Sequence, residues 1–164
     1  TAECWALALS TKNRPSILAL TRQALPHLRA DAASANHCAR GGYIIRPAKA
    51  KRRVTLIATG SEVSLAVEAR ETLEAQGIGT AVVSMPCWDL FEAQPDDYRA
   101  RVIGRGTVRV AVEAAVKFGW ERWIGDDGGF VGMSSFGASG AADELFRHFG
   151  ITAEKVVEAA LARL

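Results

Sequence analysis

Three apolar runs in the second half of the chain alternate with segments of helical periodicity. Residues 54–58, 80–84 and 107–113 are short, rich in valine, and bounded by glycine or polar residues, which predicts strands. A nearly continuous apolar run is typical of a strand that is covered on both faces of its sheet. Because helical segments lie between these strands, we expect an α/β fold, a mostly parallel sheet flanked by helices.

The helix between the first two of these strands has recognisable ends. Ser61 is expected to cap its N-terminus, with Glu62 in the first turn, where a negative charge favours the helix dipole. Gly77 is expected to end the helix in the left-handed conformation, with Ile78 folding back against it.

Two helices are expected to close the chain, and a short helical stretch is expected at residues 88–91. The first closing helix would be capped by Ser139 and stop at Gly150, and the second would be capped by Thr152. Their expected buried residues are Leu145, Phe146 and Phe149 in the first, and Val156, Val157, Ala160, Leu161 and Leu164 in the second.

The amino-terminal part of the chain differs from the rest. Residues 2–11 have helical periodicity, and residues 16–20 read as a short buried strand. Residues 26–53 are mostly polar, with one brief strand at 43–45, and such a long irregular connection is unusual within one domain. We therefore expect a domain boundary near residue 40. Because the chain begins at Thr1 with a helix already under way, we expect it to be the carboxy-terminal piece of a larger protein.

Composition excludes several classes of protein. Of the residues, 49% are hydrophobic and 23% charged, and the net charge is +2, as in a globular protein. The basic run at residues 46–53 is too short for a nucleic-acid arm and is interpreted as a solvated linker. No segment reaches the roughly 18 apolar residues of a membrane span. Cys4, Cys38 and Cys87 are far apart and lack metal or disulfide spacing, which favours reduced thiols in the cytoplasm.

Most site-like features favour a structural role. The glycine-rich residues 125–129 lack the Lys-Ser/Thr ending of a P-loop, and their two aspartates would repel an anion, so a surface turn is expected. Residues 59–62 follow a strand, where α/β sheets often bind ligands, but Glu62 would stand where a phosphate must lie.

The remaining candidates do not form a catalytic set either. His27, His37 and His148 have no metal-site spacing, and Cys87 has no evident base. The acidic pairs at 96–97 and 143–144 are neighbours in sequence and do not converge. Trp120 and Trp123 are expected to be core or interface aromatics.

Arg22 is the one promising binding residue. It directly follows the predicted strand at residues 16–20, and the carboxyl end of a strand is where an α/β sheet presents its ligand groups. A guanidinium is always charged and binds a phosphate through two parallel hydrogen bonds. A surface arginine or an ion-pair partner is the alternative.

Six strings in order and in register resemble the end of transketolase, over the whole chain. They are Ile17-Leu-Ala-Leu-Thr-Arg-Gln23, Ala39-Arg-Gly-Gly-Tyr43, Leu56-Ile-Ala-Thr-Gly-Ser-Glu-Val63, Val82-Val-Ser-Met-Pro86, Val108-Arg-Val-Ala-Val-Glu-Ala114 and Gly132-Met-Ser-Ser-Phe-Gly137. The resemblance implies that residues 1–38 are the tail of the pyrimidine-binding domain and that residues 39–164 are the transketolase carboxy-terminal domain.

The resemblance also implies a function for the full-length protein. Transketolases move a two-carbon ketol unit from a ketose phosphate, such as xylulose 5-phosphate, to an aldose phosphate, such as ribose 5-phosphate, in the pentose phosphate pathway or in carbon fixation. They use thiamine diphosphate with Mg²⁺ or Ca²⁺ and act as cytoplasmic homodimers. Arg22 matches the family's substrate-phosphate arginine. The catalytic, cofactor-binding and metal-binding residues are expected outside this chain, which alone would be inactive.

Some positions depart from the family pattern, and two other readings stay open. Ala24 replaces a common asparagine, Gly104 and Ala141 replace common prolines, and Cys87 replaces a common serine. Deoxyxylulose-phosphate synthase and the 2-oxoacid dehydrogenase E1 component share the last domain. A stand-alone interaction domain is the third reading.

Overall fold

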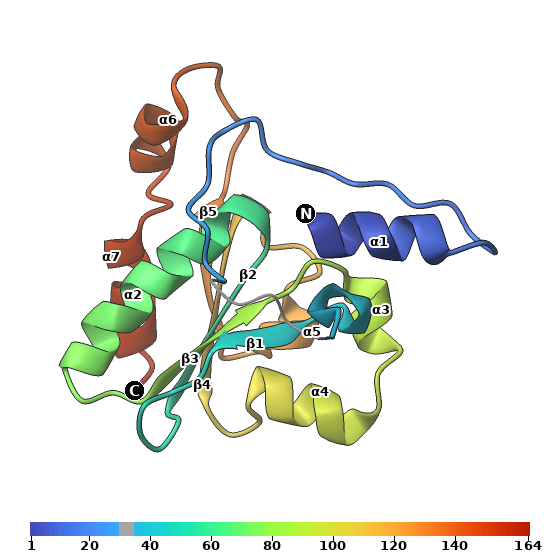
Figure 1. Ribbon diagram of the computed structural model, residues 1–164. Coiled ribbons are helices and arrows are strands. Elements are labelled where there is room, and N and C mark those ends of the chain that lie inside the picture. The colour runs from blue at the N-terminus through green and yellow to red at the C-terminus, as the bar shows by residue number, and fades with distance from the viewer. Residues whose placement is uncertain (30–34) are drawn as a thin grey trace.

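A five-stranded sheet forms the centre of the computed structural model, which describes residues 1–29 and 35–164 (Figure 1). Its strands are β1 (Tyr43–Arg46), β2 (Val54–Ala58), β3 (Thr80–Ser84), β4 (Val108–Val116) and β5 (Gly129–Met133). They lie in the order β1-β3-β2-β4-β5. Only β1 is antiparallel to its neighbour, and the other pairs are parallel. The expected mostly parallel α/β sheet is therefore confirmed.

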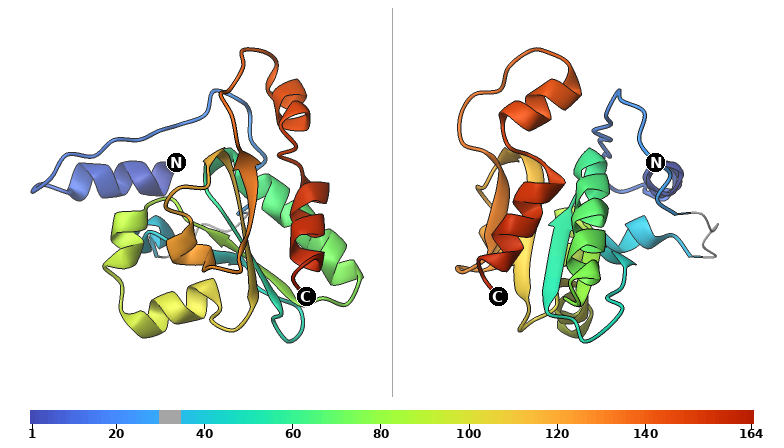
Figure 2. Two further views of the ribbon diagram at one scale, coloured as in Figure 1. Left: turned by 180° about the vertical axis from the view of Figure 1, so that it is seen from behind. Right: turned by 90° about the vertical axis from the view of Figure 1, so that its left-hand side faces the viewer.

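Helices cover both faces of this sheet (Figures 1 and 2). On one face lie α2 (Val63–Ala75) and α7 (Ala153–Leu161), and on the other lie α3 (Trp88–Glu92), α4 (Asp96–Ile103) and α5 (Glu121–Ile124). The remaining elements are α1 (Ala2–Ser10), α6 (Ala142–His148) and the 3-10 turns η1 (His37–Arg40) and η2 (Gly60–Glu62). No helix in residues 1–29 and 35–164 is long and apolar enough to cross a membrane.

The central strand β2 shows how the sheet divides two cores. Its side chains alternate, so that Leu56 joins α2 and α7 while Ile57 joins the aromatic core of Phe91 and Trp123. Both β2 side chains are fully buried. Full burial of one aliphatic side chain contributes about 1.5–3 kcal/mol, so a strand buried on both faces anchors both layers.

The C-terminal end of α2 agrees with the prediction from sequence, and its N-terminal end does not. Gly77 has φ +76°, and Ile78 donates its N–H to the carbonyl of Leu73 at 3.0 Å, which confirms the expected C-terminal motif. The expected cap at Ser61 is wrong. Its hydroxyl donates instead to Oε2 of Glu62 at 2.9 Å, because residues 60–62 form the 3-10 turn η2 before α2 begins.

The closing helices lie where the pattern predicts them, with different details. Thr152 caps α7 by accepting the N–H of Lys155 at 3.4 Å, as expected. Ser139 does not cap α6, which begins after Ala141 without a side-chain cap. In α6 and at its carboxyl end, the residues expected to be buried are only half-buried: Leu145, Phe146 and Phe149. At the end of the chain, two residues expected to be buried are exposed: Leu161 and Leu164.

Several elements differ from those that the sequence predicts. The strand β5 and the helices α4 and α5 were not expected, and β4 extends three residues past Glu113. The strand expected at residues 16–20 is wrong. That segment is extended but joins no sheet among the described residues, and Ile17 is 95% exposed. None of the five strands of the sheet pairs with this segment, so its apolar run has no neighbouring strand among the described residues.

The basic run before β2 is more than a solvated linker. Arg52 donates to Thr55 Oγ1 at 2.9 Å and to the carbonyls of Arg101 and Val102 at 2.8 and 2.6 Å. Burial lowers its pKa to about 10. Arg52 thus holds the carboxyl end of α4 against the start of β2, whereas Lys51 and Arg53 are exposed as expected.

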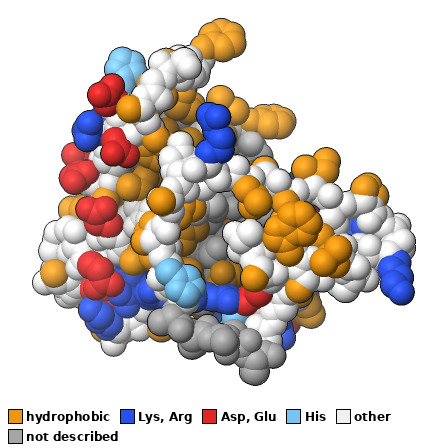
Figure 3. Space-filling view, turned by 45° about the horizontal axis from the view of Figure 1, so that its top comes forward, with side chains coloured by type: hydrophobic (Ala, Val, Ile, Leu, Met, Phe, Trp, Pro, Cys, Tyr) orange, Lys and Arg blue, Asp and Glu red, His pale blue; other side chains and the backbone are white. Residues whose placement is uncertain are grey.

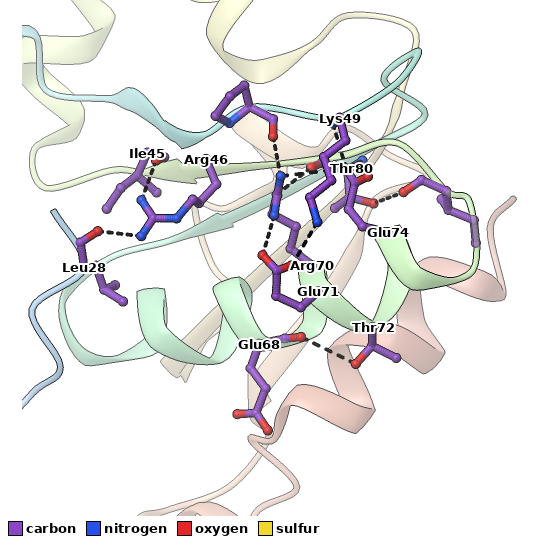
Figure 4. Close-up of polar contacts among 12 residues, drawn as sticks. Leu28, Ile45, Arg46, Lys49, Glu68, Arg70, Glu71, Thr72, Glu74 and Thr80 are labelled. Atoms are coloured by element: carbon purple, nitrogen blue, oxygen red, sulfur yellow. Dashed lines mark hydrogen bonds and ion pairs between the residues drawn. The ribbon is translucent and has the colours of Figure 1, made fainter. Parts of the chain in front are cut away.

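A buried arginine secures the rest of this linker to α2 (Figure 4). Arg70 is 5% exposed and donates to the carbonyls of Pro47 and Thr80 at 2.7 and 3.1 Å. Glu74 accepts the backbone N–H groups of Lys49 and Thr80 at 3.0 and 2.8 Å. Burial raises the pKa of Glu74, but these N–H groups and the nearby cations outweigh it, so the pKa is lowered.

Candidate functional site

Arg22 lies on an extended segment that passes over one end of the molecule. Residues 11–28 leave α1, run between α1 and α6, and descend to the edge strand β1 (Figure 1). At the far end Arg46 on β1 donates to the carbonyl of Leu28 at 2.6 Å (Figure 4). The segment is therefore held at both ends, by α1 and by β1, and Arg22 lies between these attachments.

The side chain of Arg22 is exposed and free to bind a ligand. Its guanidinium forms no hydrogen bond or ion pair with any residue that the structure describes. Its neighbours Thr21 and Gln23 bond to each other through their side chains. Arg22 does not, however, follow a buried strand, so the sequence argument from its own strand end is not confirmed by the fold.

A cavity of about 450 Å³ lies beside this segment, between residues 23–26 and the helices α2, α6 and α7. Its charged lining consists of Glu68, Asp143, Glu154 and Arg147, and Arg22 is not among the lining residues. Three carboxylates against one guanidinium disfavour an anion. A phosphate held by Arg22 would therefore lie outside this cavity.

The surface above the carboxyl ends of the strands has an acidic part and a hydrophobic part (Figure 3). Acidic side chains gather on one side of this view, and hydrophobic side chains gather over α1 and the extended segment. The large exposed hydrophobic residues of α1 and this segment are Trp5, Leu9, Ile17, Leu20 and Leu25. Arg22 thus follows an apolar stretch of an otherwise sparsely charged segment.

The switch point of the sheet carries two carboxyl groups that the sequence did not lead us to pair. The chain goes from β2 to β3 on one side of β2 and then from β3 to β4 on its other side, and the crevice at such a reversal often binds ligands. Glu62 follows β2, is 4% exposed, and accepts the backbone N–H of Ala114 at 3.2 Å. Glu113, near the end of β4, is half-buried, and its Oε2 has no hydrogen-bond partner among the described residues.

The surroundings of Glu113, including Glu62, change the pKa of its carboxyl group. Burial, with the nearby charge of Glu62, raises the pKa of Glu113 to about 8, although a backbone hydrogen bond at Thr59 opposes the shift. Glu62 was expected in the first turn of the helix. It lies in η2, directly before α2, and its carboxylate turns inward to accept the N–H of Ala114 on β4. The negative charge of Glu62 in this crevice opposes a phosphate, so the pair does not favour an anion.

Other sequence candidates are structural in the fold. Residues 125–128 form the expected surface turn, with Asp126 and Asp127 exposed, whereas Gly129 is buried and begins β5. Trp120 and Trp123 are buried in the aromatic core, as expected. His37 stacks on Tyr43 with ring centroids 5.3 Å apart, and His148 meets Phe149 edge-on.

The described residues do not fit a metal or a diphosphate. No group of three His, Cys, Asp or Glu side chains within residues 1–29 and 35–164 could hold a metal ion. The Glu62 carboxylate at the switch point also opposes a diphosphate there. A divalent metal with a diphosphate cofactor would therefore need ligands from outside these residues.

Comparison with known proteins gives a consistent result. Residues 41–152 match the model of the transketolase-like TK C-terminal domain. A transketolase of Sinorhizobium medicae is 56% identical over 100% of this chain, and one of Geobacillus stearothermophilus is 43% identical over 100%. The chain spans about a quarter of their length, 24% and 25%.

Solved structures agree over nearly the whole chain. A transketolase from Leishmania mexicana superimposes with a TM-score of 0.87 and 40% identity, covering 99% of this chain and 23% of that one. A Pichia stipitis transketolase in complex with sedoheptulose-7-phosphate gives a TM-score of 0.87 and 38% identity, with the same coverage of 99% and 23%.

Proposed function

This chain belongs to the transketolase family, and we propose that the protein containing it transfers a two-carbon ketol group from a ketose phosphate to an aldose phosphate. The observation that carries this proposal is the likeness over 99–100% of the chain, in sequence and in fold, to transketolases. Relatives from Pichia stipitis are described in complex with sedoheptulose-7-phosphate and xylulose-5-phosphate, which supports sugar phosphates as the substrates.

Within this function we propose that Arg22 binds the phosphate group of the sugar. Its guanidinium is exposed and unpaired among the described residues, and its position in Thr21-Arg22-Gln23 matches the family motif. Two parallel N–H donors suit a phosphate, and a charge-assisted bond of this kind contributes about 1.5–3 kcal/mol. The bond orients the far end of the sugar and takes no part in bond making.

The cofactor and the catalytic groups belong, in this proposal, to the rest of the protein. Thiamine diphosphate with Mg²⁺ or Ca²⁺ would supply the carbanion chemistry, held by residues outside this chain, because the described residues offer no fitting ligand set. Residues 1–38 would complete the pyrimidine-binding domain, and residues 39–164 would be the carboxy-terminal domain. The assembled enzyme would be a cytoplasmic homodimer, and the chain alone would be inactive.

The test uses the whole protein that contains this chain. It is incubated with thiamine diphosphate, Mg²⁺, xylulose 5-phosphate and ribose 5-phosphate, and the seven-carbon and three-carbon products are measured. The proposal predicts both products. Ligation of pyruvate to glyceraldehyde 3-phosphate, oxidative decarboxylation of a 2-oxoacid, or no reaction at all would each refute it. Either pathway, pentose phosphate or carbon fixation, is compatible with a positive result, because both use the same transfer.

A further inference from the structure

All three cysteines of the chain line one cavity of about 350 Å³. Cys4 lies on α1, Cys38 on the 3-10 turn η1, and Cys87 immediately before α3. Their wide spacing in the sequence gave no reason to pair them, yet the fold brings them to one place. Each is a free thiol.

The contacts of Glu3 bring Cys4 to Cys38. The Glu3 carboxylate accepts the backbone N–H of Cys38 at 3.0 Å, and the Glu3 carbonyl accepts the Asn36 side-chain N–H at 2.8 Å. An ion pair with Arg29 holds the same carboxylate. Glu3 and Cys38 are 35 positions apart, so these bonds fix the first turn of α1 on η1 and leave Cys4 beside Cys38.

Cys87 is held by a different contact. Its backbone N–H donates to the carbonyl of Gly41 at 3.0 Å, and it precedes the first residue of α3. Cys87 thus shares the cavity without sharing the bonds that join α1 to η1. It is a natural internal control for any chemistry assigned to the other two.

The two neighbouring thiols differ in their environment. Cys4 is half-buried on the cavity wall, whereas Cys38 is 9% exposed. Burial raises the pKa of the Cys38 thiol to about 12, and the Cys4 thiol beside it adds to this effect. Because Cys4 is the more exposed of the two thiols, Cys4 is the first to meet an oxidant.

We propose that Cys4 and Cys38 form an oxidation site, in which a hydroperoxide converts the two thiols into an intrachain disulfide. The Cys4 thiol gives up its proton, its sulfur attacks one peroxide oxygen and the O–O bond breaks. Sulfur loses two electrons and becomes a sulfenic acid, and the leaving hydroxide or alkoxide takes up the proton and departs as water or an alcohol. The Cys38 sulfur then attacks the Cys4 sulfur. The S–S bond forms, the S–O bond breaks, and hydroxide leaves with the Cys38 proton as water.

The position of this bond has a structural consequence. The disulfide would join α1 to η1, directly before Gly41 and the edge strand β1. A crosslink across so long a stretch of chain restricts the unfolded state strongly. The fold places two free thiols side by side here, and the described residues contain no group of side chains that could hold a metal ion.

The test is peptide mapping of the whole protein without reduction. Trypsin cleaves after Lys12, Arg29, Arg40, Arg70 and Arg99, and so separates the three cysteines into three peptides. After treatment with hydrogen peroxide, the proposal predicts a crosslinked pair of the Cys4 and Cys38 peptides, lighter than their sum by two hydrogen atoms. Dithiothreitol should restore both single peptides.

Matched variants keep the proposal falsifiable even if one of them folds poorly. Cys87→Ser should form the same crosslink to the same extent as the unmodified protein. Cys38→Ser and Cys38→Ala should lose it and leave a Cys4 sulfenic acid that dimedone traps, whereas Cys4→Ser should lose both products. Crosslinks mainly to Cys87, Cys4 oxidised only to sulfinic acid in the unmodified protein, or three unchanged thiols would each overturn the proposal.

Discussion

The Glu62 carboxylate accepts the backbone N–H that follows Glu113, so that an acidic side chain just after β2 meets one on the neighbouring strand β4 at the switch point of the sheet. Glu62 is turned inward, and Glu113 has an oxygen without a partner among the described residues. The relationship explains why this crevice, which binds anions in many α/β proteins, does not suit a phosphate here. The raised pKa of Glu113 also leads us to expect that stability depends on pH.

Glu113→Gln should flatten the pH dependence of stability. The pKa of Glu113 is about 8 in the fold and 4.5 ordinarily, so between these values the folded state binds the proton more tightly. Its contribution to stability is therefore full below pH 4.5 and is lost as the pH rises towards 8. Glutamine has no proton to lose. The variant should melt higher than the unmodified protein at about pH 8.

Thermal melting at several pH values between about 5 and 8 checks this expectation. Glu144→Gln is the matched control, because Glu144 is exposed on α6. Parallel pH profiles for the unmodified protein and for Glu113→Gln would contradict the assignment.

Arg70→Ala should destabilise the domain strongly. The change removes the donors to Pro47 and Thr80 and leaves the buried Glu74 carboxylate without its nearby cation. Removing one partner of a buried ion pair costs about 3–5 kcal/mol. The urea midpoint of unfolding is the measurement. Lys155→Ala, which removes the exposed pair with Glu158, should change stability by no more than about 1 kcal/mol. Equal effects of the two changes would argue against a structural Arg70.

Gly41→Ala should be far more damaging than Gly77→Ala. Both glycines have positive φ, +73° and +76°, so alanine is strained by about 1–2 kcal/mol at either. At Gly41 a Cβ would also lie 2.2 Å from the backbone nitrogen of Phe91 and 2.3 Å from the carbonyl oxygen of Cys87. At Gly77 nothing lies within 4 Å. Thermal melting of the two variants separates steric overlap from backbone strain, and similar losses in both would refute the close approach at Gly41.

The sequence predicted the parts of the fold whose signal is local. The strands at 54–58 and 80–84 are uninterrupted apolar runs, and the end of α2 is marked by Gly77. The strand β5 was missed because Gly129 and Gly132 weaken the apolar pattern that marks a strand. The strand expected at 16–20 was wrong because an apolar run becomes a strand only beside a partner.

The candidate site was predictable to a smaller extent. Arg22 stood out by its chemistry and by the motif around it. Its surroundings, however, depend on the path that residues 11–28 take over one end of the molecule. Glu62 and Glu113 could have been paired by noting that each lies at or just after the end of a strand. Their contact required the strand order, which places β4 beside β2. Cys4 and Cys38 likewise meet only through the bonds of Glu3.

The most direct test of the central claim is the steady-state kinetics of Arg22→Ala in the whole protein. The variant should raise KM for a phosphorylated acceptor about 10–100-fold, because losing about 1.5–3 kcal/mol of binding corresponds to that factor. It should leave KM for a non-phosphorylated acceptor nearly unchanged. Arg105→Ala, at an exposed arginine in the turn between α4 and β4, is the control and should affect neither substrate. An equal loss for both acceptors in Arg22→Ala would contradict the phosphate role of Arg22.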